Sequence, residues 1–463
     1  MIAEAGNVAL KLSEYIVGLR YEDLPREVVQ RAKTSTLDAI GCMIMASRIP
    51  LGPIIIQTVR DLGGVPESTV VTGGFKTSCV NATLANGTLV HADELDQVGT
   101  AGVSGHPAAV ALAASLAVAE REGVTGKAYI TAVVLGYDVH NRVGEAVGAR
   151  NKLHLRSFAP AVVGCFPGAA VTAKLLRLPV QQVNHALGLA GATTGGLQSW
   201  LDGESQHMTK ALTYGHSSAV GVQSALLAHM GFAGPPSIFQ GKFSVMNALV
   251  DQGDLMAITR DLGTRFDIMS ARFKKYSAGS PFHAPLDGLL KIMDGQGLEA
   301  DQLAEVTVQM PMRNKLLFGD DPPTLSVNPQ YLLAIAAYDR KVELEAHSEE
   351  RAKDPKVWEL KKRIRMVWSS ELEKDPRLHY AGIVEVRTRA GQTFTEKVVH
   401  PPGSTENPLS QEQIEEKFFS LSAKVISRRQ ADRIRDVVAN LESMQNLRGL
   451  GDLVRGELNG GAG

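Results

Sequence analysis

The sequence predicts a mainly α-helical protein with a smaller α+β part that comes before its C-terminal end. Apolar residues recur at three- and four-residue spacing from the N-terminus to about Met269, which is the period of amphipathic helices. Four short segments between 304 and 399 instead alternate apolar and polar residues, as half-buried strands do. From Ser410 the helical period returns. We therefore expect the last segment to pack back on the first domain.

The helical part contains residues that typically begin or end helices. Pro107 stands where a first-turn proline is tolerated, and Gly123 follows the last charged turn of the same stretch. The segment 194–206 breaks the pattern, so we predict a loop there. The predicted helices before position 269 are 3–19, 25–45, 107–122, 127–147, 160–176, 179–189 and 214–230.

The second part mixes strands and helices. The predicted strands are 304–310, 364–368, 382–388 and 392–399. The last two flank Arg389-Ala390-Gly391, a short hairpin signal. Helical runs at 286–293 and 330–337 lie among them. This mixture is typical of a small α+β domain.

Length and composition limit the function classes. A chain of 463 residues is too long for one ordinary core, so two or more domains are expected. A net charge of -1 gives no electrostatic reason to expect nucleic acid or a membrane as partner. The three cysteines, Cys42, Cys79 and Cys165, contain no C-x-x-C pair. Together with an N-terminus that lacks a signal pattern, they indicate a cytoplasmic protein. No Walker loop or G-x-G-x-x-G after a strand supports nucleotide binding.

The segment 86–110 is the strongest candidate for chemistry. Within sixteen residues, among small apolar side chains, it carries five ionisable residues: His91, Asp93, Glu94, Asp96 and His106. Buried carboxylates and imidazoles are costly unless they are paired, and clusters of them are frequent at sites of proton transfer. A surface loop would also hold them at little cost. His91, His106 and Asp93 could in principle hold a metal, but no histidine pair has H-x-x-x-H spacing, so we predict no metal.

Three further segments carry candidate cations. Lys210 precedes a helix of small residues, where it could anchor a carboxylate or transfer a proton. The segment 272–283 joins the helical and the α+β parts and is rich in basic residues, and domain junctions often form clefts. The pair Arg313 and Lys315 follows a strand. Each could equally be a solvated surface group. The segment 215–219 (G-H-S-S-A) nearly matches a serine-hydrolase elbow, but no strand precedes it.

Several blocks of the chain together resemble one family. The segment 86–107 resembles the N-G…H-x-x-D-x-x-D…H-P pattern of the MmgE/PrpD family, with the first aspartate one place early, as His91-Ala92-Asp93. This family contains 2-methylcitrate dehydratase, cis-aconitate decarboxylase and iminodisuccinate epimerase. The likeness continues through Met208-Thr209-Lys210, Lys274-x-Tyr276 with His283, Asn328-x-x-Tyr331, and Asn407-Pro408-Leu409-Ser410 before Lys417-Phe418.

The resemblance implies a fold, an assembly and a site. It implies a large all-helical domain made from both chain ends (1–268 and 404–463), an inserted α+β lid (269–403), and a homodimer. The active site of relatives lies in the cleft between the domains. The family's catalytic positions correspond here to Asp93, His106, Lys210 and Lys274. The candidates for substrate binding are Asp96, Gln97, Arg272, Lys275, His283 and Tyr331.

Three departures from the family pattern bear on the substrate. Gln97 stands where relatives often have threonine, and Ala159, within Phe158-Ala159-Pro160-Ala161, stands where many have the histidine of F-H-P-T. Tyr276-Ser277-Ala278-Gly279 stands where relatives often have Y-P and a cysteine.

The predicted function is a cofactor-independent, lyase-type acid–base enzyme acting on a small di- or tricarboxylate. Dehydration of a 2-methylcitrate-like hydroxy acid is the first expectation. An epimerase or isomerase, a decarboxylase of a related acid, and a non-catalytic carboxylate-binding homologue are the alternatives. Lys210 and Lys274 would hold carboxylates and stabilise developing negative charge, with Arg272 as a helper. His106 would transfer protons near neutral pH, and Asp93 would orient a partner or act as a base.

Overall fold

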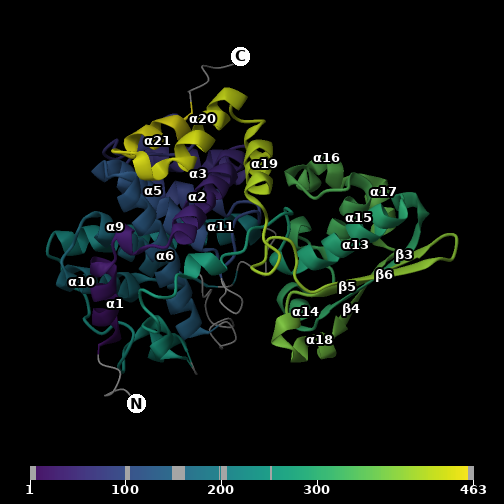
Figure 1. The fold of residues 1–463 in the computed structure, drawn as a ribbon, viewed down its shortest axis with the longest axis horizontal. Coiled ribbons are helices and arrows are strands. Elements are labelled where there is room, and N and C mark those ends of the chain that lie inside the picture. Colours follow the sequence, from purple (N-terminus) through teal and green to yellow (C-terminus); the bar gives the residue numbers. More distant parts are fainter. Residues whose placement is uncertain are drawn as a thin grey trace. The chain divides into compact units, whose positions relative to one another are not determined.

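The computed structural model describes residues 7–99, 105–148, 162–197, 199, 206–250 and 253–456. The chain divides into two compact units (Figure 1). The helical unit comprises Met1–Ala92, Asp96–Ala271 and Ser410–Gly463, and the sheet unit comprises Asp93–Leu95 and Arg272–Leu409. Residues 93–95 therefore belong to the sheet unit, although their chain neighbours belong to the helical unit. The mainly α fold class is confirmed.

The helical unit is built mainly from helices. Its helices from the N-terminal side are α1 (Val8–Gly18), α2 (Arg26–Ala46), α3 (Leu51–Leu62), α4 (Cys79–Val90), α5 (Ala113–Glu122), α6 (Gly126–Val147), α9 (Cys165–Leu175), α10 (Val180–Thr193), α11 (Gln206–His229) and α12 (Val245–Leu249). The C-terminal segment adds α19 (Gln411–Ser422), α20 (Arg428–Ala439) and α21 (Arg448–Val454). Two short strands, β1 (Ser68–Thr69) and β2 (Lys76–Thr77), pair antiparallel.

Both chain ends contribute to one hydrophobic core in this unit. Helix α19 packs on α2, and the yellow C-terminal helices lie beside the purple N-terminal ones in Figure 1. Phe418 and Ile434 are buried in the same core as Leu12 and Ile40. A Cβ at Gly41 would come within 3.2 Å of the Phe418 ring, so a small residue allows this close approach. Helices from the C-terminal segment therefore share one core with α1 and α2.

Some predicted helices differ from the observed ones. Helix α11 begins at Gln206 and not at 214, so its first two turns were not predicted. Helices α3 and α4 were not predicted. No single helix in the described part of the chain is long and apolar enough to cross a bilayer. Only α2 and α3 together, across a bend of 91°, meet that length and composition.

The sheet unit contains four strands and several helices. The strands are β3 (Leu303–Pro311), β4 (Ile364–Ser369), β5 (Gly382–Thr388) and β6 (Thr393–Val398), which confirms all four predicted strands. The helices are α13 (His283–Gln296), α14 (Arg313–Phe318), α15 (Pro329–Asp339), α16 (Glu349–Ala352), α17 (Pro355–Lys361) and α18 (Ser370–Lys374).

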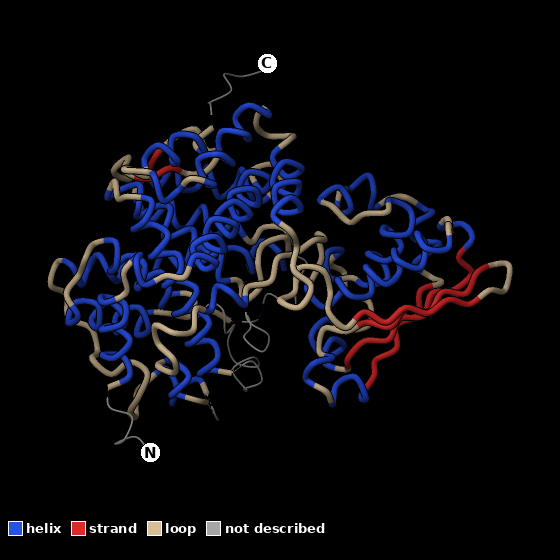
Figure 2. Tube along the Cα trace, viewed as in Figure 1, coloured by secondary structure: helices blue, strands red, loops and turns tan. Residues whose placement is uncertain are grey.

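The strands form one sheet in the order β4-β3-β5-β6 (Figure 2, red). β3 and β4 are parallel, whereas β5 pairs antiparallel with β3 and with β6. Helices α13 and α15 contact the sheet on the face that is buried. In β5, Val384 and Val386 are buried while Glu385 and Arg387 are exposed, the alternation expected when one face meets the core.

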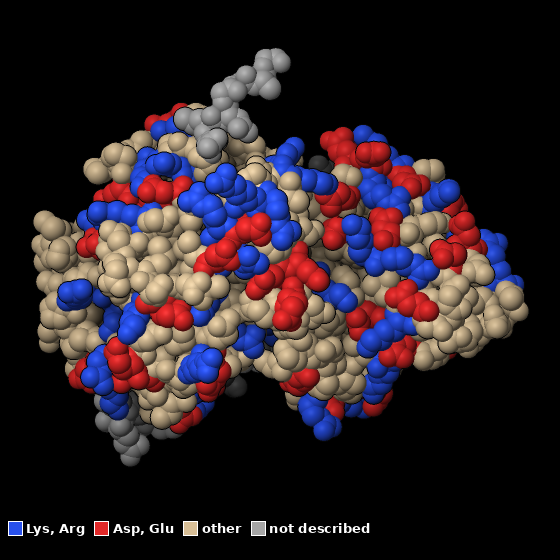
Figure 3. All heavy atoms as spheres, turned by 45° about the horizontal axis from the view of Figure 1, so that its top comes forward, with Lys and Arg blue, Asp and Glu red and all other residues tan. Residues whose placement is uncertain are grey.

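Basic and acidic side chains intermingle on the surface that Figure 3 shows. This agrees with the near-balance of 48 basic and 49 acidic residues.

Candidate active site

A close contact between α4 and α11 positions the first group of candidate residues. A Cβ at Gly87 would lie 2.8 Å from the Cα of Gly215 and 2.8 Å from the carbonyl oxygen of Ala109, so only glycine allows the helices to approach this closely. His91 caps the C-terminal end of α4, and Tyr214 lies on α11. The contact therefore brings their rings to a centroid distance of 4.5 Å.

His91, Asp96, His106 and Tyr214 form a buried group in the helical unit, which we call the imidazole cluster. The Nδ1 of His91 donates a hydrogen bond to Oδ1 of Asp96 at 2.9 Å. The Nδ1 of His106 lies 3.0 Å from the same oxygen as an ion-pair contact. The two imidazole rings are 4.0 Å apart, and Tyr214 lies 5.3 Å from His106. One carboxylate oxygen thus faces both imidazoles.

The backbone after His106 is also unusual. A π-helical turn at Ala108–Leu112 follows Pro107 and leads into α5. Single π-helical turns occur frequently at functional sites. All five residues of this turn are buried, so the turn fixes the start of α5 against its neighbours.

The imidazole cluster keeps Asp96 ionised. Burial raises the pKa of this carboxyl group, but the charges and hydrogen bonds of His106 and His91 outweigh burial, so the pKa lies well below its usual range. An imidazole whose Nδ1–H faces a carboxylate presents Nε2 as a lone-pair acceptor. We assign this tautomer to both rings from the carboxylate that they share. The arrangement suits a general base that a buried carboxylate orients.

The same three residues could be considered as metal ligands, because one ligand-type atom from each of His91, Asp96 and His106 lies within 4.8 Å of the others. Ligand atoms about 2.0–2.2 Å from a tetrahedral zinc ion would be roughly 3.3 Å apart. The oxygen-to-nitrogen distances of 2.9 and 3.0 Å are those of hydrogen-bonded pairs. The geometry therefore favours a proton-transfer group, and the expectation of no metal stays a prediction.

Gln97, the residue after Asp96 of the imidazole cluster, is held by hydrogen bonds to two helices. The Gln97 amide donates to the Ser35 carbonyl at 3.1 Å and to Oδ2 of Asp38 at 3.0 Å, and its oxygen accepts from the Tyr137 hydroxyl at 2.7 Å. Lys417 donates to the other oxygen of Asp38 at 2.7 Å. Gln97 is completely buried, so its described contacts tie α2 to α6.

Asp93, Glu94, Lys274, Ser277 and His347 form a second group, in the sheet unit, which we call the carboxyl cluster. The Nζ of Lys274 donates to Oε2 of Glu94 at 2.6 Å, with both side chains buried. The Ser277 hydroxyl donates to Oδ2 of Asp93 at 2.6 Å. The Nε2 of His347 lies 2.8 Å from the Ser277 carbonyl and 3.0 Å from its hydroxyl.

The carboxyl cluster changes the acidity of Asp93. Burial raises the pKa of this group, and the charge of Glu94 raises it further. His347, the Ser277 hydroxyl and Lys274 act in the opposite direction without cancelling burial. The Asp93 carboxyl therefore holds a proton at a higher pH than an exposed aspartate does. A raised carboxyl pKa suits a group that gives and takes a proton near neutral pH.

Comparison with known proteins decides the family. The model of the MmgE/PrpD N-terminal domain matches residues 10–257, and the model of the MmgE/PrpD C-terminal domain matches residues 276–443. The chain belongs to the MmgE/PrpD family. It is 27% identical to the cis-aconitate decarboxylase-like protein oryM of Aspergillus oryzae, with 98% of each chain covered. It is 25% identical to cis-aconitate decarboxylase of Aspergillus terreus, with 96% of each covered. It is 23% identical to 2-methylcitrate dehydratase of Cupriavidus necator, with 80% of this chain and 78% of the relative covered.

Each of two predicted cations of this MmgE/PrpD chain is related to a tyrosine. Lys210 is half-buried on α11 and precedes Tyr214 by four residues, so it shares that face of the helix with the ring of the imidazole cluster. Arg272 donates to the Tyr380 hydroxyl at 3.0 Å and lies 4.0 Å from its ring centroid. Burial raises the pKa of Tyr380, but the charge and hydrogen bond of Arg272 together with the charge of Arg313 outweigh burial and leave the pKa below its usual value.

Three other predicted residues of the family pattern have contacts within the sheet unit. Lys275 is exposed, with its Nζ 4.0 Å from a carboxylate oxygen of Asp287. His283 is buried, with its Nε2 3.3 Å from the Ala278 carbonyl oxygen. Tyr331 is completely buried, and its hydroxyl donates to the Ala346 carbonyl at 2.5 Å. No described contact joins these three side chains to the carboxyl cluster, although Tyr331 bonds to the residue before His347.

The segment 158–161, where this chain lacks the family's histidine, lies outside the described residues. Sequence reasoning assigned no role to several residues of the two clusters: His91, Glu94, Tyr214, Ser277 and His347. His91 and Glu94 were noted within the charged segment 86–110 but received no role there. No local pattern marks Tyr214 or His347, which reach the clusters only through tertiary packing.

Proposed function

We propose that this MmgE/PrpD protein is a cofactor-independent lyase that uses acid–base chemistry on a small di- or tricarboxylate. One observation carries the proposal: residues 91–106 supply two buried groups of proton-transfer residues, the imidazole cluster and the carboxyl cluster. Buried ionisable groups are costly unless they are paired, and clusters of them are frequent at sites of proton transfer. Asp93 and Glu94 lie between His91 and Asp96 along the chain, so one short segment supplies members of both groups.

The two main candidate reactions share an electronic problem. In dehydration, a base removes a proton from the carbon next to a carboxylate, and the β-hydroxyl leaves as water after an acid protonates it. In decarboxylation, a carboxylate leaves as carbon dioxide, and an acid protonates the carbon skeleton that keeps the electron pair. In both, negative charge spreads into a remaining carboxylate. The protein must therefore supply fixed cations and a positioned acid or base.

The described residues fit these roles. His106 is the proposed general base or acid, with Asp96 as the positioning residue that holds the Nδ1 side of its ring. Asp93 is the second acid–base group, because its pKa is raised mainly by burial. Lys274 and Lys210 are the proposed carboxylate anchors. The Glu94 carboxylate holds the Lys274 ammonium in one place, which gives the anchor a fixed direction.

A decarboxylase of a cis-aconitate-like acid is the second candidate within this class. One observation favours it over dehydration of a 2-methylcitrate-like acid: the decarboxylase of Aspergillus terreus covers 96% of this chain, whereas the dehydratase of Cupriavidus necator covers 80%. Return of the proton to the opposite face of the same carbon would instead give an epimerase.

The test is incubation of the purified chain with 2-methylcitrate, citrate and cis-aconitate in deuterated buffer, followed by proton NMR. A new alkene signal from a hydroxy acid supports dehydration, and loss of carbon dioxide supports decarboxylation. Deuterium incorporation without net conversion supports epimerisation. Binding of these acids without any exchange or product would overturn the enzyme proposal in favour of a carboxylate-binding homologue. The matched control is His106→Ala, which should lose turnover by about 10²–10⁴-fold.

We also propose that the protein works as a cytoplasmic homodimer. The three cysteines are buried free thiols, in keeping with a reducing compartment. Exposed apolar side chains follow the outer face of α11 and the turn after it: Met208, Leu212, Leu227, Met230 and Phe232. Apolar patches of this kind are typical of protein interfaces. Light scattering should therefore give twice the chain mass, and Met230→Glu should reduce it toward the monomer, whereas a monomeric mass for the native chain would contradict the proposal.

A further inference from the structure

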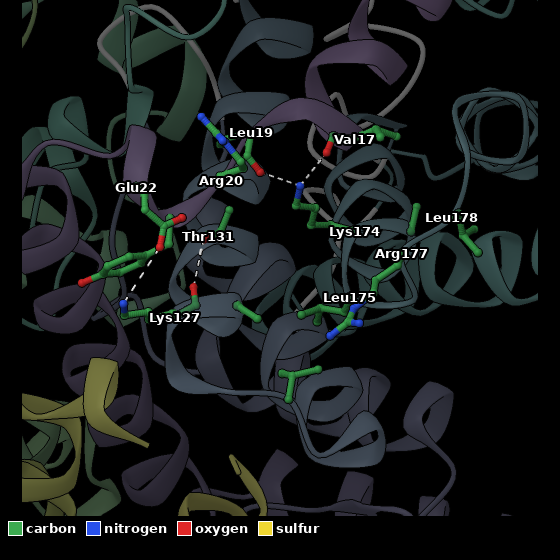
Figure 4. A pocket seen from close by; sticks show the side chains of 14 residues that line it. Val17, Leu19, Arg20, Glu22, Lys127, Thr131, Lys174, Leu175, Arg177 and Leu178 are labelled. Carbon is green, nitrogen blue, oxygen red and sulfur yellow. Dashed lines mark hydrogen bonds and ion pairs between the residues drawn. The ribbon is translucent and has the colours of Figure 1, made fainter. Parts of the chain in front are cut away.

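A cavity of about 390 Å³ lies in the helical unit and shares no lining residue with the imidazole cluster (Figure 4). Its wall comes from three segments: the end of α1 with the turn after it, the first turns of α6, and the last turn of α9 with the residues that follow. Its volume lies in the range of small-ligand sites. Buried leucines, Leu19, Leu175 and Leu178, supply its apolar floor.

Four cationic side chains line this cavity, against one acidic side chain, Glu22. Two of the cations are compensated within the protein. Arg20 pairs with Asp23 at 2.9 Å, and Lys127 lies 3.9 Å from Glu22. The other two, Lys174 and Arg177, have no acidic side chain within ion-pair distance in the described ranges. The cavity therefore has about two positive charges without an ion-pair partner.

Lys174 is held in a fixed position at the cavity. Its ammonium donates to the carbonyl oxygens of Val17 at 2.9 Å and Leu19 at 2.5 Å, the unpaired acceptors at the C-terminal end of α1 (Figure 4). An ammonium has three N–H donors, so one is left for a ligand. Burial lowers the pKa of Lys174, with Asp23 acting weakly in the opposite direction. A partly desolvated cation of this kind would be stabilised by a bound anion.

Arg177 is the second cation. It follows α9 and is exposed, and its guanidinium makes no hydrogen bond or ion pair to any side chain that the structure describes. It lies three residues after Lys174, and both side chains line the same cavity. Two cations above an apolar floor favour a compact ligand with two negative charges, because the apolar wall reduces screening by water.

We propose that this cavity, the basic pocket, binds a small dianion, either a polycarboxylate or a phosphate, at a site separate from the candidate active site. Lys174 and Arg177 neutralise the two charges, and the leucine floor contacts the uncharged part of the ligand. A dianion bound there would contact α1, α6 and α9 together. The proposal does not depend on the proposed reaction, because it uses none of the residues of the two clusters.

The test is isothermal titration calorimetry of the full chain at low salt with two probes, citrate and inorganic phosphate. The variant Arg177→Gln should weaken binding of at least one probe by about tenfold, since a hydrogen bond to a charged group is worth about one factor of ten or more. The matched control is Arg429→Gln, which removes an exposed arginine of α20 that has no described ion pair. It should leave the binding curve unchanged.

Because citrate also resembles the proposed substrate, the titration is repeated on Lys210→Met, which leaves the basic pocket intact. Retained binding in this variant, sensitive to Arg177→Gln, supports the pocket as a second site. A response to citrate alone identifies a carboxylate ligand, and a response to phosphate alone identifies a phosphate ligand. The proposal is overturned if neither probe binds to Lys210→Met, or if Arg177→Gln and Arg429→Gln give the same curve as the native chain.

Discussion

The sharpest test of the candidate active site is the substitution Asp96→Asn. The Asp96 side chain is completely buried, its pKa lies well below the usual range because His106 and His91 face it, and one of its oxygens contacts both rings. Asparagine keeps the shape of the side chain but removes its charge. Its NH₂ group can take the place of Oδ2, which has no described hydrogen-bond partner, while its oxygen still faces the two rings. The substitution therefore perturbs the protonation and tautomer of the imidazoles more than the packing.

The magnitude follows from these contacts. A hydrogen bond to a charged group contributes about 1.5–3 kcal/mol, but losing it is partly offset because a buried charge no longer needs to be desolvated. We expect a net loss of about 1–3 kcal/mol in the free energy of unfolding. Turnover should fall much further, by about 10²–10⁴-fold, if Asp96 orients the general base. The acid limb of the pH–rate profile should also move to lower pH, because a negative charge 3.0 Å away favours the imidazolium form.

The assay compares kcat, KM, the pH–rate profile and urea unfolding for the native chain and the variant. Asp138→Asn is the matched control, since Asp138 is an equally buried carboxylate of the helical unit that bonds to Tyr15 and not to an imidazole. Asp138→Asn should change the free energy of unfolding, while its kcat stays within about threefold of the native value. If Asp96→Asn kept kcat within the same limit and left the pH profile in place, the positioning role of Asp96 would be refuted.

Three further predictions can be measured directly. Lys274→Met should raise the apparent KM for a di- or tricarboxylate by about 10–100-fold, because the substrate loses a charged contact. The exposed control Lys291→Met should leave KM unchanged. An unchanged KM in Lys274→Met would exclude the anchor role. Burial raises the pKa of Asp138 to about 7. Native stability should therefore fall as pH rises from about 4 to 7, by at most about 4 kcal/mol, because the unfolded state binds fewer protons there. The melting temperature of Asp138→Asn should lack this decrease with pH. If the melting temperatures of the native chain and the variant changed in parallel with pH, the role of Asp138 would be contradicted. Dialysis against a chelator should leave turnover unchanged, and a loss that added zinc restores would make the imidazole cluster a metal site.

The sequence predicted the sheet unit's strands well because their burial is periodic. In the segment 382–388 the valines face the core and the charged residues face water, so the pattern and the structure carry the same information. Helix α4 (Cys79–Val90) shows the opposite case. It is buried on nearly every side, so it has no polar face and no helical period to detect. Helix α11 was placed too late because its first turn follows a glycine-rich segment that suggested a loop.

The sequence marked some residues of the candidate site but not the contacts between them. His91, Asp93, Glu94 and Asp96 are close in the chain, and their charged character alone drew attention to them. Their pairing was not predictable. The hydrogen bond from Ser277 to Asp93 joins residues 184 positions apart, and no local rule indicates it. Gln97 was expected to contact substrate, which stays a prediction. Its hydrogen bonds to α2 and α6 could not be predicted, because those partners lie far from its own segment.

Because residues 93–95 belong to the sheet unit, they affect the design of chimeras between relatives of this protein. A chimera that exchanges only the continuous stretch 272–409 would leave its donor's Lys274 and Ser277 facing the recipient's version of Asp93 and Glu94. The graft has to include these three residues, although they sit far upstream in the gene. A crossover plan drawn from the linear order alone would cut through two short hydrogen bonds.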